Sequence, residues 1–326
     1  MRKNRILTAR LHAFLTEPSP TRDPIIAFVR AHMACGTRSV ALCFRGTAAT
    51  LYYRCHQLLR IRGSRTGVVG EFDFRHARFT KDYKGILETL RALGVDTSRF
   101  SDVAAKNAQK YLIVPLSGKE AVPCEAIDTI LLAFMALIDD FLDPALTAYA
   151  FDIGPARNKS AGLEKDRQQQ LYAAYFLKND LLYYDLEYAE PYAEQSGVHG
   201  RFDLLGLRRE GDFYSLLFTE LKSTRSACGG KAGIADHEKD YLAYLSSVFI
   251  ENRKKEACET VKLLCEIFGV PFPANLTPDR IQTAKIKFVF SDTAIPVGAR
   301  YAPADARIER AYLCPDCGLE KPYENE

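Results

Sequence analysis

Residues 200–224 read GRFDLLGLRREGDFYSLLFTELKST, two apolar runs separated by a polar turn at residues 210–212. Runs rich in strand-forming residues on either side of such a turn predict a β-hairpin. Side chains along a strand alternate between the two faces of a sheet, so Glu220 and Lys222 are expected on one face. The hairpin lays its first strand alongside the second and can bring Asp203 beside this pair.

The Glu-x-Lys triplet needs support from its surroundings, because about one is expected by chance in a chain of this length and most are solvated surface. The similar triplet 82–84 precedes a stretch with helical period, where residues two apart do not face each other, and we interpret it as a helix start. Residues 215–219, by contrast, are apolar enough for a buried strand, and charges at the end of such a strand need a reason. Two carboxylates suit Mg²⁺ or Mn²⁺, and an ammonium group can hold or polarise water beside the metal.

The segments around the hairpin predict a simple order of elements. Helical period and strand composition together indicate a helix, three strands, a helical region and a final strand. Apart from the hairpin itself, these are the helix at 160–177, the strand at 181–190, the helical region at 234–268 and the strand at 284–291.

That order, with Asp203 on the second strand and Glu220-Leu221-Lys222 on the third, resembles the PD-(D/E)XK nuclease superfamily over residues 160–291. The resemblance implies an α/β, restriction-endonuclease-like fold, with an αβββαβ core whose mixed sheet is flanked by helices. It implies that Asp203 and Glu220 bind a divalent metal, Mg²⁺ or Mn²⁺, and that Lys222 assists the attacking water. The backbone carbonyl of the intervening residue, here Leu221, is often a further metal ligand in that family.

Other positions of the family pattern are matched less closely. Many members place a glutamate on the first core helix, and Glu164 is the positional candidate here. Some members carry Gln-x-x-x-Tyr on the helix after the motif, where this chain has His237 and Tyr241 as accessory candidates. Phe202 stands where the family signature has a proline before the aspartate.

Positive charge is concentrated near the N-terminus. Residues 1–65 hold twelve Lys or Arg side chains against Glu17 and Asp23, a net charge of +10, whereas the other 261 residues sum to −7. A solvated basic surface is the alternative, but an acidic metal site repels a polyanion, so we favour contact with phosphates. The expected nucleic-acid contacts, with DNA favoured over RNA, are Arg2, Lys3, Arg5 and Arg10.

The chain is long enough for two cores, so we expect separate domains. Residues 1–155 are expected to form a basic α+β module for substrate recognition or regulation, with residues 154–159 as the link. Residues 156–300 form the nuclease-like domain, and residues 301–326 are a tail with a Cys-x-x-Cys pair. Strand patterns near 38–44 and around a turn at 63–67, and helical patterns near 81–94 and 123–141, support the first module.

The Cys-x-x-Cys pair, Cys314 and Cys317, looks like a zinc knuckle. A complete Zn²⁺ site needs two more ligands, and Cys258 and Cys265 are either those ligands or core residues. The nine scattered cysteines fit reduced thiols in a cytoplasmic protein. No apolar run reaches the length of a membrane span, and no membrane partner is expected.

The sequence therefore predicts a metal-dependent nuclease that hydrolyses phosphodiester bonds, with a DNA endonuclease favoured. The family resemblance implies a setting in restriction, defence or repair. The alternative is a non-catalytic nucleic-acid-binding protein that retains the nuclease fold. A homo-oligomer is compatible with the sequence.

Overall fold

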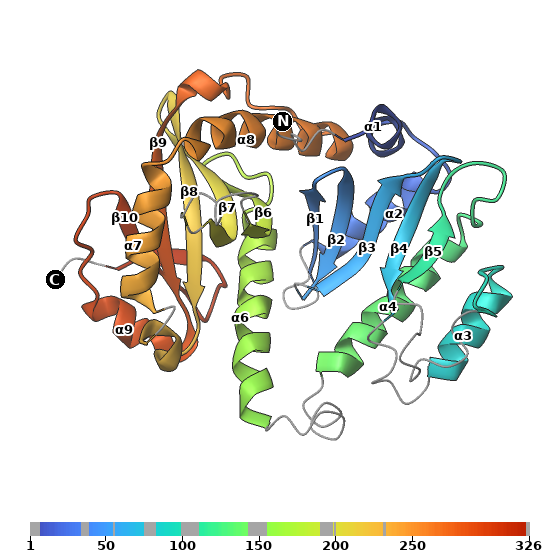
Figure 1. Cartoon of the computed structure of the whole chain (residues 1–326), viewed down its shortest axis with the longest axis horizontal. Helices are drawn as coiled ribbons and strands as arrows, with labels where there is room; N and C mark the ends of the chain where they lie inside the picture. The colour runs from blue at the N-terminus through green and yellow to red at the C-terminus, as the bar shows by residue number, and fades with distance from the viewer. Residues whose placement is uncertain are drawn as a thin grey trace. The chain divides into compact units, whose positions relative to one another are not determined.

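The computed structural model describes residues 7–33, 39–54, 56–74, 83–98, 111–142, 155–189, 198, 200–230 and 233–323 of the chain. The chain is an α/β protein that divides into two compact units, Met1–Gly162 and Leu163–Glu326. An antiparallel five-stranded sheet forms the first unit and a curled, mixed six-stranded sheet forms the second, each with helices packed against it (Figure 1).

The sheet of the first unit is a meander in which each strand pairs with the next along the chain, all antiparallel. Helix α4 contacts β3, α2 contacts β1 and α4, and α1 contacts β3 and β4. The strands are β1 (Val40–Arg45), β2 (Ala48–Tyr53), β3 (His56–Gly63), β4 (Val68–Asp73) and β5 (Tyr111–Pro115), and the helices are α1 (Ala9–Thr16), α2 (Arg22–His32), α3 (Tyr83–Ala92) and α4 (Ala126–Leu142).

The predicted turn at residues 63–67 is confirmed, because β3 and β4 pair on either side of it. The pattern of residues 51–61 predicts a single strand before this turn, but the segment is divided between β2 and β3. The chain reverses at Arg54, which adopts a left-handed φ of 49°. Tyr53 is buried and its hydroxyl donates to Asp139, so this aromatic ring belongs to the core.

The predicted order of helix, three strands, helical region and strand is present in the second unit. Strands β6, β7 and β8 are antiparallel neighbours, and β9 joins β8 in parallel after the helical region. The elements are α6 (Pro155–Ala174), β6 (Leu181–Ala189), β7 (Arg201–Glu210), β8 (Phe213–Lys222), α7 (Ile234–Leu245), α8 (Phe249–Phe268), β9 (Ile281–Phe290), α9 (Ile295–Arg300), β10 (Ile308–Leu313) and β11 (Glu320–Pro322).

Strand β8 lies in the middle of the C-terminal sheet, between β7 and β9, and all its residues after Phe213 are buried. The β7–β8 hairpin closes at the predicted turn, where Gly211 has a φ of 68° that favours glycine. Helix α7 packs against β9 and α8 contacts β6. The charged end of β8 therefore lies in a buried, central part of the sheet.

Three features from α6 onward were not anticipated from sequence. Helix α6 begins at Pro155, within the segment expected as a link. The helical region is divided into α7 and α8 by residues 246–248. Within the segment expected as a tail, residues 301–323 supply β10, parallel to β9, and β11, which extend the sheet.

Among the described residues, every helix is too short or too polar to cross a lipid bilayer.

Candidate metal centre

The end of β8 carries a buried ion pair. Glu220 and Lys222 lie on the same face of the strand, as the alternation of side chains requires, and Lys222 Nζ is 2.9 Å from Glu220 Oε1. Their side chains are only 9% and 5% exposed. Leu204 on β7 pairs with Thr219 on β8. One step further along these antiparallel strands, Asp203 lies opposite Glu220. The structure thus brings these three side chains together.

Asp203 also contacts the backbone of β8. Its Oδ2 accepts a hydrogen bond of 2.7 Å from the backbone N–H of Leu221. The N–H and C=O groups of one strand residue point to the same side, so the Leu221 carbonyl also faces β7. The Leu221 side chain is fully buried on the opposite face of the sheet. The Asp203 carboxylate and the Leu221 carbonyl, which are the expected metal ligands, therefore lie on the side of β8 that faces β7.

Helix α7 supplies two further polar groups. His237 and Tyr241 are four residues apart and so share one face of the helix. The Tyr241 hydroxyl donates to Glu220 Oε2 at 2.5 Å, and His237 Nδ1 lies 2.9 Å from the same hydroxyl oxygen. His237 Nε2 is 3.4 Å from Glu220 Oε1. Glu220 is thus contacted by a lysine, a tyrosine and a histidine.

A cavity of about 360 Å³ opens over these groups. Two charged lining residues, Glu187 and Arg201, were missed by the sequence analysis. Arg201 precedes Asp203 by two positions on β7, so strand alternation could have placed it on the same face. Glu187 was harder to place, because the β6 register shifts between Tyr183 and Asp185, and Glu187 itself has a left-handed φ of 52°. The described residues that line the cavity are Glu187, Ala189, Arg201, Phe202, Asp203, Glu220, His237 and Tyr241.

The carboxylates of the centre influence one another. Burial raises the pKa of Glu164, on α6, to about 7; the Lys222 ammonium opposes this shift and the Glu220 carboxylate adds to it. Burial, and then the Glu220 and Glu164 carboxylates, raise the pKa of Asp203 well above its usual range. Burial and the Glu220 carboxylate also raise the pKa of Tyr241, which keeps its phenol a donor. Crowded carboxylates of this kind favour a bound cation.

The donor set fits a magnesium or manganese ion. Mg²⁺ is usually held by one or two carboxylates, with waters and substrate phosphates completing its coordination. Asp203 and Glu220 supply two carboxylates, and the Leu221 carbonyl supplies a third hard oxygen. Within the described part of the chain, no three His, Cys, Asp or Glu side chains converge as a ready-made site. Glu164 is close enough to interact electrostatically with the centre, without completing such a cluster.

The tail cysteines lie in a closed turn. The N–H of Cys314 donates to Leu319 O and the N–H of Gly318 donates to Cys314 O, both at 2.9 Å. Cys258 and Cys265 are buried on α8, and the described residues bring no third side-chain ligand to the turn. A structural zinc site requires four ligands. The described residues supply only the pair, which is not by itself a complete zinc site.

Of the four predicted nucleic-acid contacts, only Arg10 lies within the described residues. Its Nη1 donates to the backbone carbonyls of Ser64, at 2.7 Å, and Arg65, at 3.2 Å, which fixes the β3–β4 turn. Arg2, Lys3 and Arg5 lie outside the described residues. Arg10 therefore has a structural role in holding this turn.

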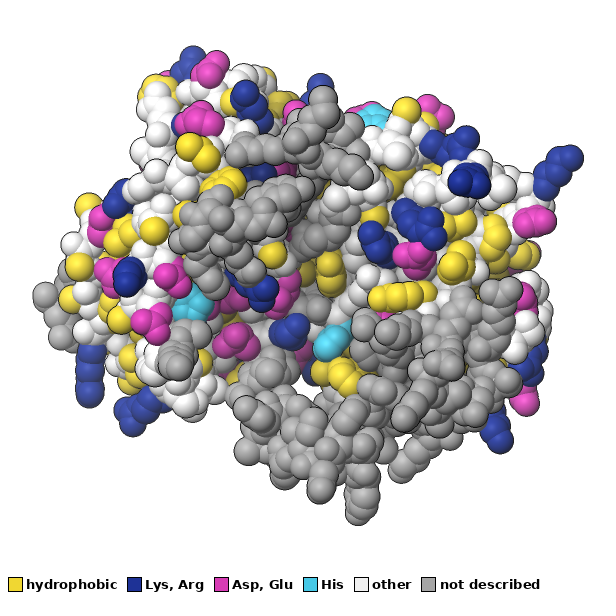
Figure 2. Space-filling view, in the orientation of Figure 1, with side chains coloured by type: hydrophobic (Ala, Val, Ile, Leu, Met, Phe, Trp, Pro, Cys, Tyr) yellow, Lys and Arg dark blue, Asp and Glu magenta, His cyan; other side chains and the backbone are white. Residues whose placement is uncertain are grey.

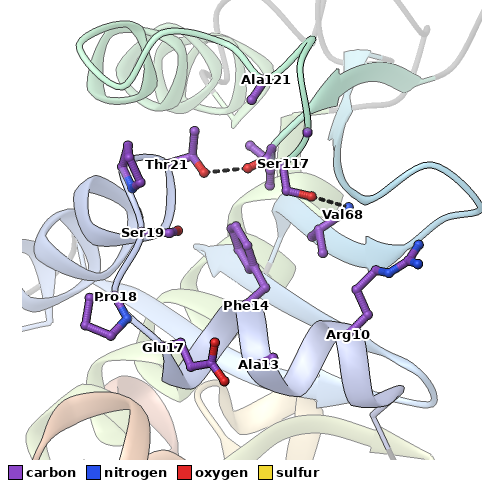
Figure 3. Close-up of a pocket in the computed structure, with 13 residues that line it drawn as sticks. Arg10, Ala13, Phe14, Glu17, Pro18, Ser19, Thr21, Val68, Ser117 and Ala121 are labelled. Carbon is purple, nitrogen blue, oxygen red and sulfur yellow. Dashed lines mark hydrogen bonds between the residues drawn. The ribbon is translucent and has the colours of Figure 1, made fainter.

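Arg10 borders a second cavity, of about 410 Å³, in the N-terminal unit (Figure 3). Its polar groups are largely engaged by the protein. The Thr21 hydroxyl donates to the Leu116 carbonyl, and Ser117 Oγ accepts from the N–H of Val68 at 2.8 Å. Much of the remaining lining is apolar, with Phe14 in the centre of the view (Figure 3).

On the face drawn in Figure 2, the described Lys and Arg side chains are interspersed with acidic ones.

Comparisons with protein-family models, with curated proteins and with solved structures found no match to this chain.

Proposed function

We propose that the C-terminal unit is a divalent-metal-dependent nuclease of the restriction-endonuclease-like fold, and that the protein hydrolyses phosphodiester bonds, with DNA as the expected substrate. The observation that carries this proposal is the meeting of Asp203, Glu220 and Lys222 on one face of a buried hairpin, beside an acidic cavity. The strand order supports it, since three antiparallel strands are followed, after helices, by a parallel fourth.

Each residue has a separate task in this proposal. Asp203, Glu220 and the Leu221 carbonyl hold the cation, which when bound neutralises the scissile phosphate and lowers the pKa of a water. Lys222 orients the attacking water and stabilises negative charge that gathers on the phosphate in the transition state. Its position is set by the hydrogen bond from Nζ to Glu220 Oε1.

Tyr241 and His237 act as positioning residues rather than as ligands. The Tyr241 hydroxyl fixes one oxygen of Glu220, and His237 contacts both that hydroxyl and the other oxygen. A carboxylate held from several sides keeps its orientation as the phosphate binds, which is the preorganisation on which electrostatic catalysis depends.

The proposal is tested by incubating the protein with supercoiled plasmid, linear duplex, single-stranded DNA and RNA, with Mg²⁺, with Mn²⁺ and with EDTA. We expect metal-dependent cleavage that EDTA stops and that Asp203→Asn and Glu220→Gln abolish. Glu251→Gln is the matched control, because this carboxylate is 72% exposed on α8 and should leave cleavage unchanged. Binding without cleavage under every condition would instead favour the non-catalytic alternative.

A further inference from the structure

Arg201 lies at the opening of the acidic cavity. It is the first residue of β7 and is exposed, while Asp203, two residues later, shares its face of the strand. Two positions along a strand correspond to roughly 6.6 Å, within the reach of an extended arginine side chain. Both residues line the same cavity, together with Glu220 on β8 and Tyr241 on α7.

Arg201 differs in charge from the acidic side chains that line the same cavity. The described side chains that line it include the three carboxylates of Glu187, Asp203 and Glu220, but only one Lys or Arg side chain, that of Arg201. Lys222 is not a substitute, because its side chain is only 5% exposed and is not part of the cavity lining. One bound divalent cation and the Lys222 ammonium would together balance the three carboxylates, so among the described Lys and Arg side chains that line the cavity Arg201 is the one that offers positive charge to a flanking phosphate.

We propose that Arg201 forms a phosphate-binding subsite at the mouth of the cavity, where it holds a backbone phosphate of the nucleic acid next to the one that reaches Asp203 and Glu220. A guanidinium presents parallel N–H donors that match two phosphate oxygens. The contact is therefore directional as well as charged. Because Arg201 is exposed and the ligand carboxylates lie deeper, it contacts a flanking phosphate. This inference rests on the proposed function.

Three variants separate the subsite from general charge effects. Arg201→Ala removes the guanidinium, and Arg201→Lys keeps the charge without the planar fork. Arg209→Ala is the control, because Arg209 is an exposed arginine at the other end of β7 whose Nε donates to the Gly211 carbonyl. Binding of a fluorescein-labelled duplex is followed by anisotropy in EDTA over a range of salt, and KM and kcat are measured with Mg²⁺.

For Arg201→Ala we expect Kd and KM to rise about tenfold, the fold-change for removing a charged hydrogen bond, with kcat within about twofold. The salt dependence should fall by about 0.9 in log Kd per log salt, the value for one phosphate contact on duplex DNA. Arg201→Lys should keep that slope and recover only part of the affinity. Arg209→Ala should match the parent.

The outcomes distinguish this subsite from the proposed function. If the parent cleaves DNA and Arg201→Ala keeps the parent's KM, Kd and salt slope, the subsite is wrong and the nuclease stands. If the parent binds DNA through Arg201 but cleaves under no condition, the nuclease is wrong and the phosphate subsite stands. A loss of kcat with unchanged Kd would also overturn the subsite, since it would place Arg201 at the reacting atoms. A parent that binds no nucleic acid would overturn both.

Discussion

Both carboxylate oxygens of Glu220 accept hydrogen bonds, Oε1 from Lys222 and Oε2 from Tyr241. A buried carboxylate with fixed donors is stable in one orientation, whereas a lone buried carboxylate is costly. The neighbouring Asp203 is held through a backbone N–H. These partners mean that the side chains of the centre are positioned by the fold itself.

Removing either carboxylate should separate binding from cleavage. We expect Asp203→Ala and Glu220→Ala to abolish metal-dependent cleavage, because each removes an oxygen ligand, and to tighten DNA binding, because each removes negative charge facing the phosphates. Lys222→Ala should lower kcat far more than it changes Kd. Gel assays of plasmid cleavage and anisotropy on a labelled duplex measure the two effects. Variants that cut as fast as the parent would show that the centre lies elsewhere.

The Tyr241 hydroxyl gives a second test at this scale. Tyr241→Phe keeps the ring but leaves Glu220 Oε2 without its donor, so we expect a loss of roughly 1–3 kcal/mol in the free energy of unfolding. A lower kcat with little change in KM should accompany it, because Glu220 loses its fixed orientation. Urea unfolding and steady-state kinetics report these two quantities. His237→Gln, which introduces the Gln-x-x-x-Tyr pattern, should retain most of the activity.

Leu221 should show the opposite behaviour to its charged neighbours. Its side chain is fully buried on the other face of β8, so Leu221→Ala should lower the free energy of unfolding by roughly 2–5 kcal/mol. Once folded, the variant should still bind the metal, because only the backbone of Leu221 faces the centre. Denaturant unfolding and Mn²⁺ binding test the two halves of this expectation. A stable variant that has lost the metal would contradict it.

Strand alternation was enough to predict from sequence that Glu220 and Lys222 share a face, and the hairpin indicated that Asp203 can lie beside them. The register that sets Asp203 opposite Glu220 comes from the structure. The contact between Tyr241 and Glu220 could not be derived in this way. It depends on where α7 packs on the sheet, and packing is decided by long-range contacts that no local pattern records. Glu187 was missed for a related reason, because its left-handed backbone interrupts the period of β6.

At the scale of elements, an ion network ties three strands of the C-terminal sheet together. Arg208 on β7 donates to Glu309 on β10 at 2.6 Å and to Glu210 at 2.7 Å. Lys285 on β9 lies 2.9 Å from Glu210 and 3.1 Å from Glu309. Partial burial alone would raise the pKa of Glu210, but the hydrogen bonds from Lys285 and Arg208 outweigh it and lower the pKa to about 2.

The network should stabilise the protein in a pH-dependent manner. The pKa of Glu210 falls on folding from its ordinary value of 4.5 to about 2, so the folded state binds fewer protons than the unfolded state as the pH drops. The stabilisation is therefore complete above about pH 4.5 and is lost toward pH 2. Replacing Glu210 and Glu309 with Gln should cost roughly 1 kcal/mol at about pH 7, since these groups are partly exposed, and progressively less in acid.

Urea unfolding of parent and double variant at several pH values measures this difference. Glu251→Gln provides the matched control, since it removes a carboxylate that is 72% exposed and paired with Lys254 on its own helix. A difference between parent and Glu210/Glu309 variant that stays constant from neutral to acid pH would mean that the network contributes nothing through its charges.

Elements with long, regular patterns were predicted, and short ones were not. The β7–β8 hairpin was predicted from sequence, and the predicted end of the helical region at residue 268 coincides with the end of α8. Gly269, which follows it, adopts a left-handed φ of 60°. Strand β11 spans only Glu320–Pro322 and carries too little pattern to be recognised. Its position comes from pairing with β10, which is a property of the sheet rather than of the segment.

At the scale of the whole molecule, the uneven charge of the chain leads to a salt-dependence test. If the first residues bind phosphates, replacing Arg2, Lys3 and Arg5 with Gln should flatten the salt dependence of duplex binding by about 0.9 for each phosphate no longer neutralised. Anisotropy titrations at several salt concentrations give the slope. Arg10→Gln is tested separately, because it also removes the hydrogen bonds that hold the β3–β4 turn and should lower stability. An unchanged slope in the triple variant would mean that its charges are merely solvated.

The irregular backbone of β6 has a consequence for how copies of the protein meet. Beta strands at sheet edges can act as templates for aggregation, because their unpaired N–H and C=O groups form a regular row. In β6 that row is broken by the register shift after Tyr183 and by the left-handed Glu187. The opposite edge, β11, is three residues long and ends in Pro322, which has no N–H to offer. In the described part of the chain, therefore, neither edge of this sheet offers a long regular row for edge-to-edge growth, and we expect copies to associate through side-chain surfaces instead.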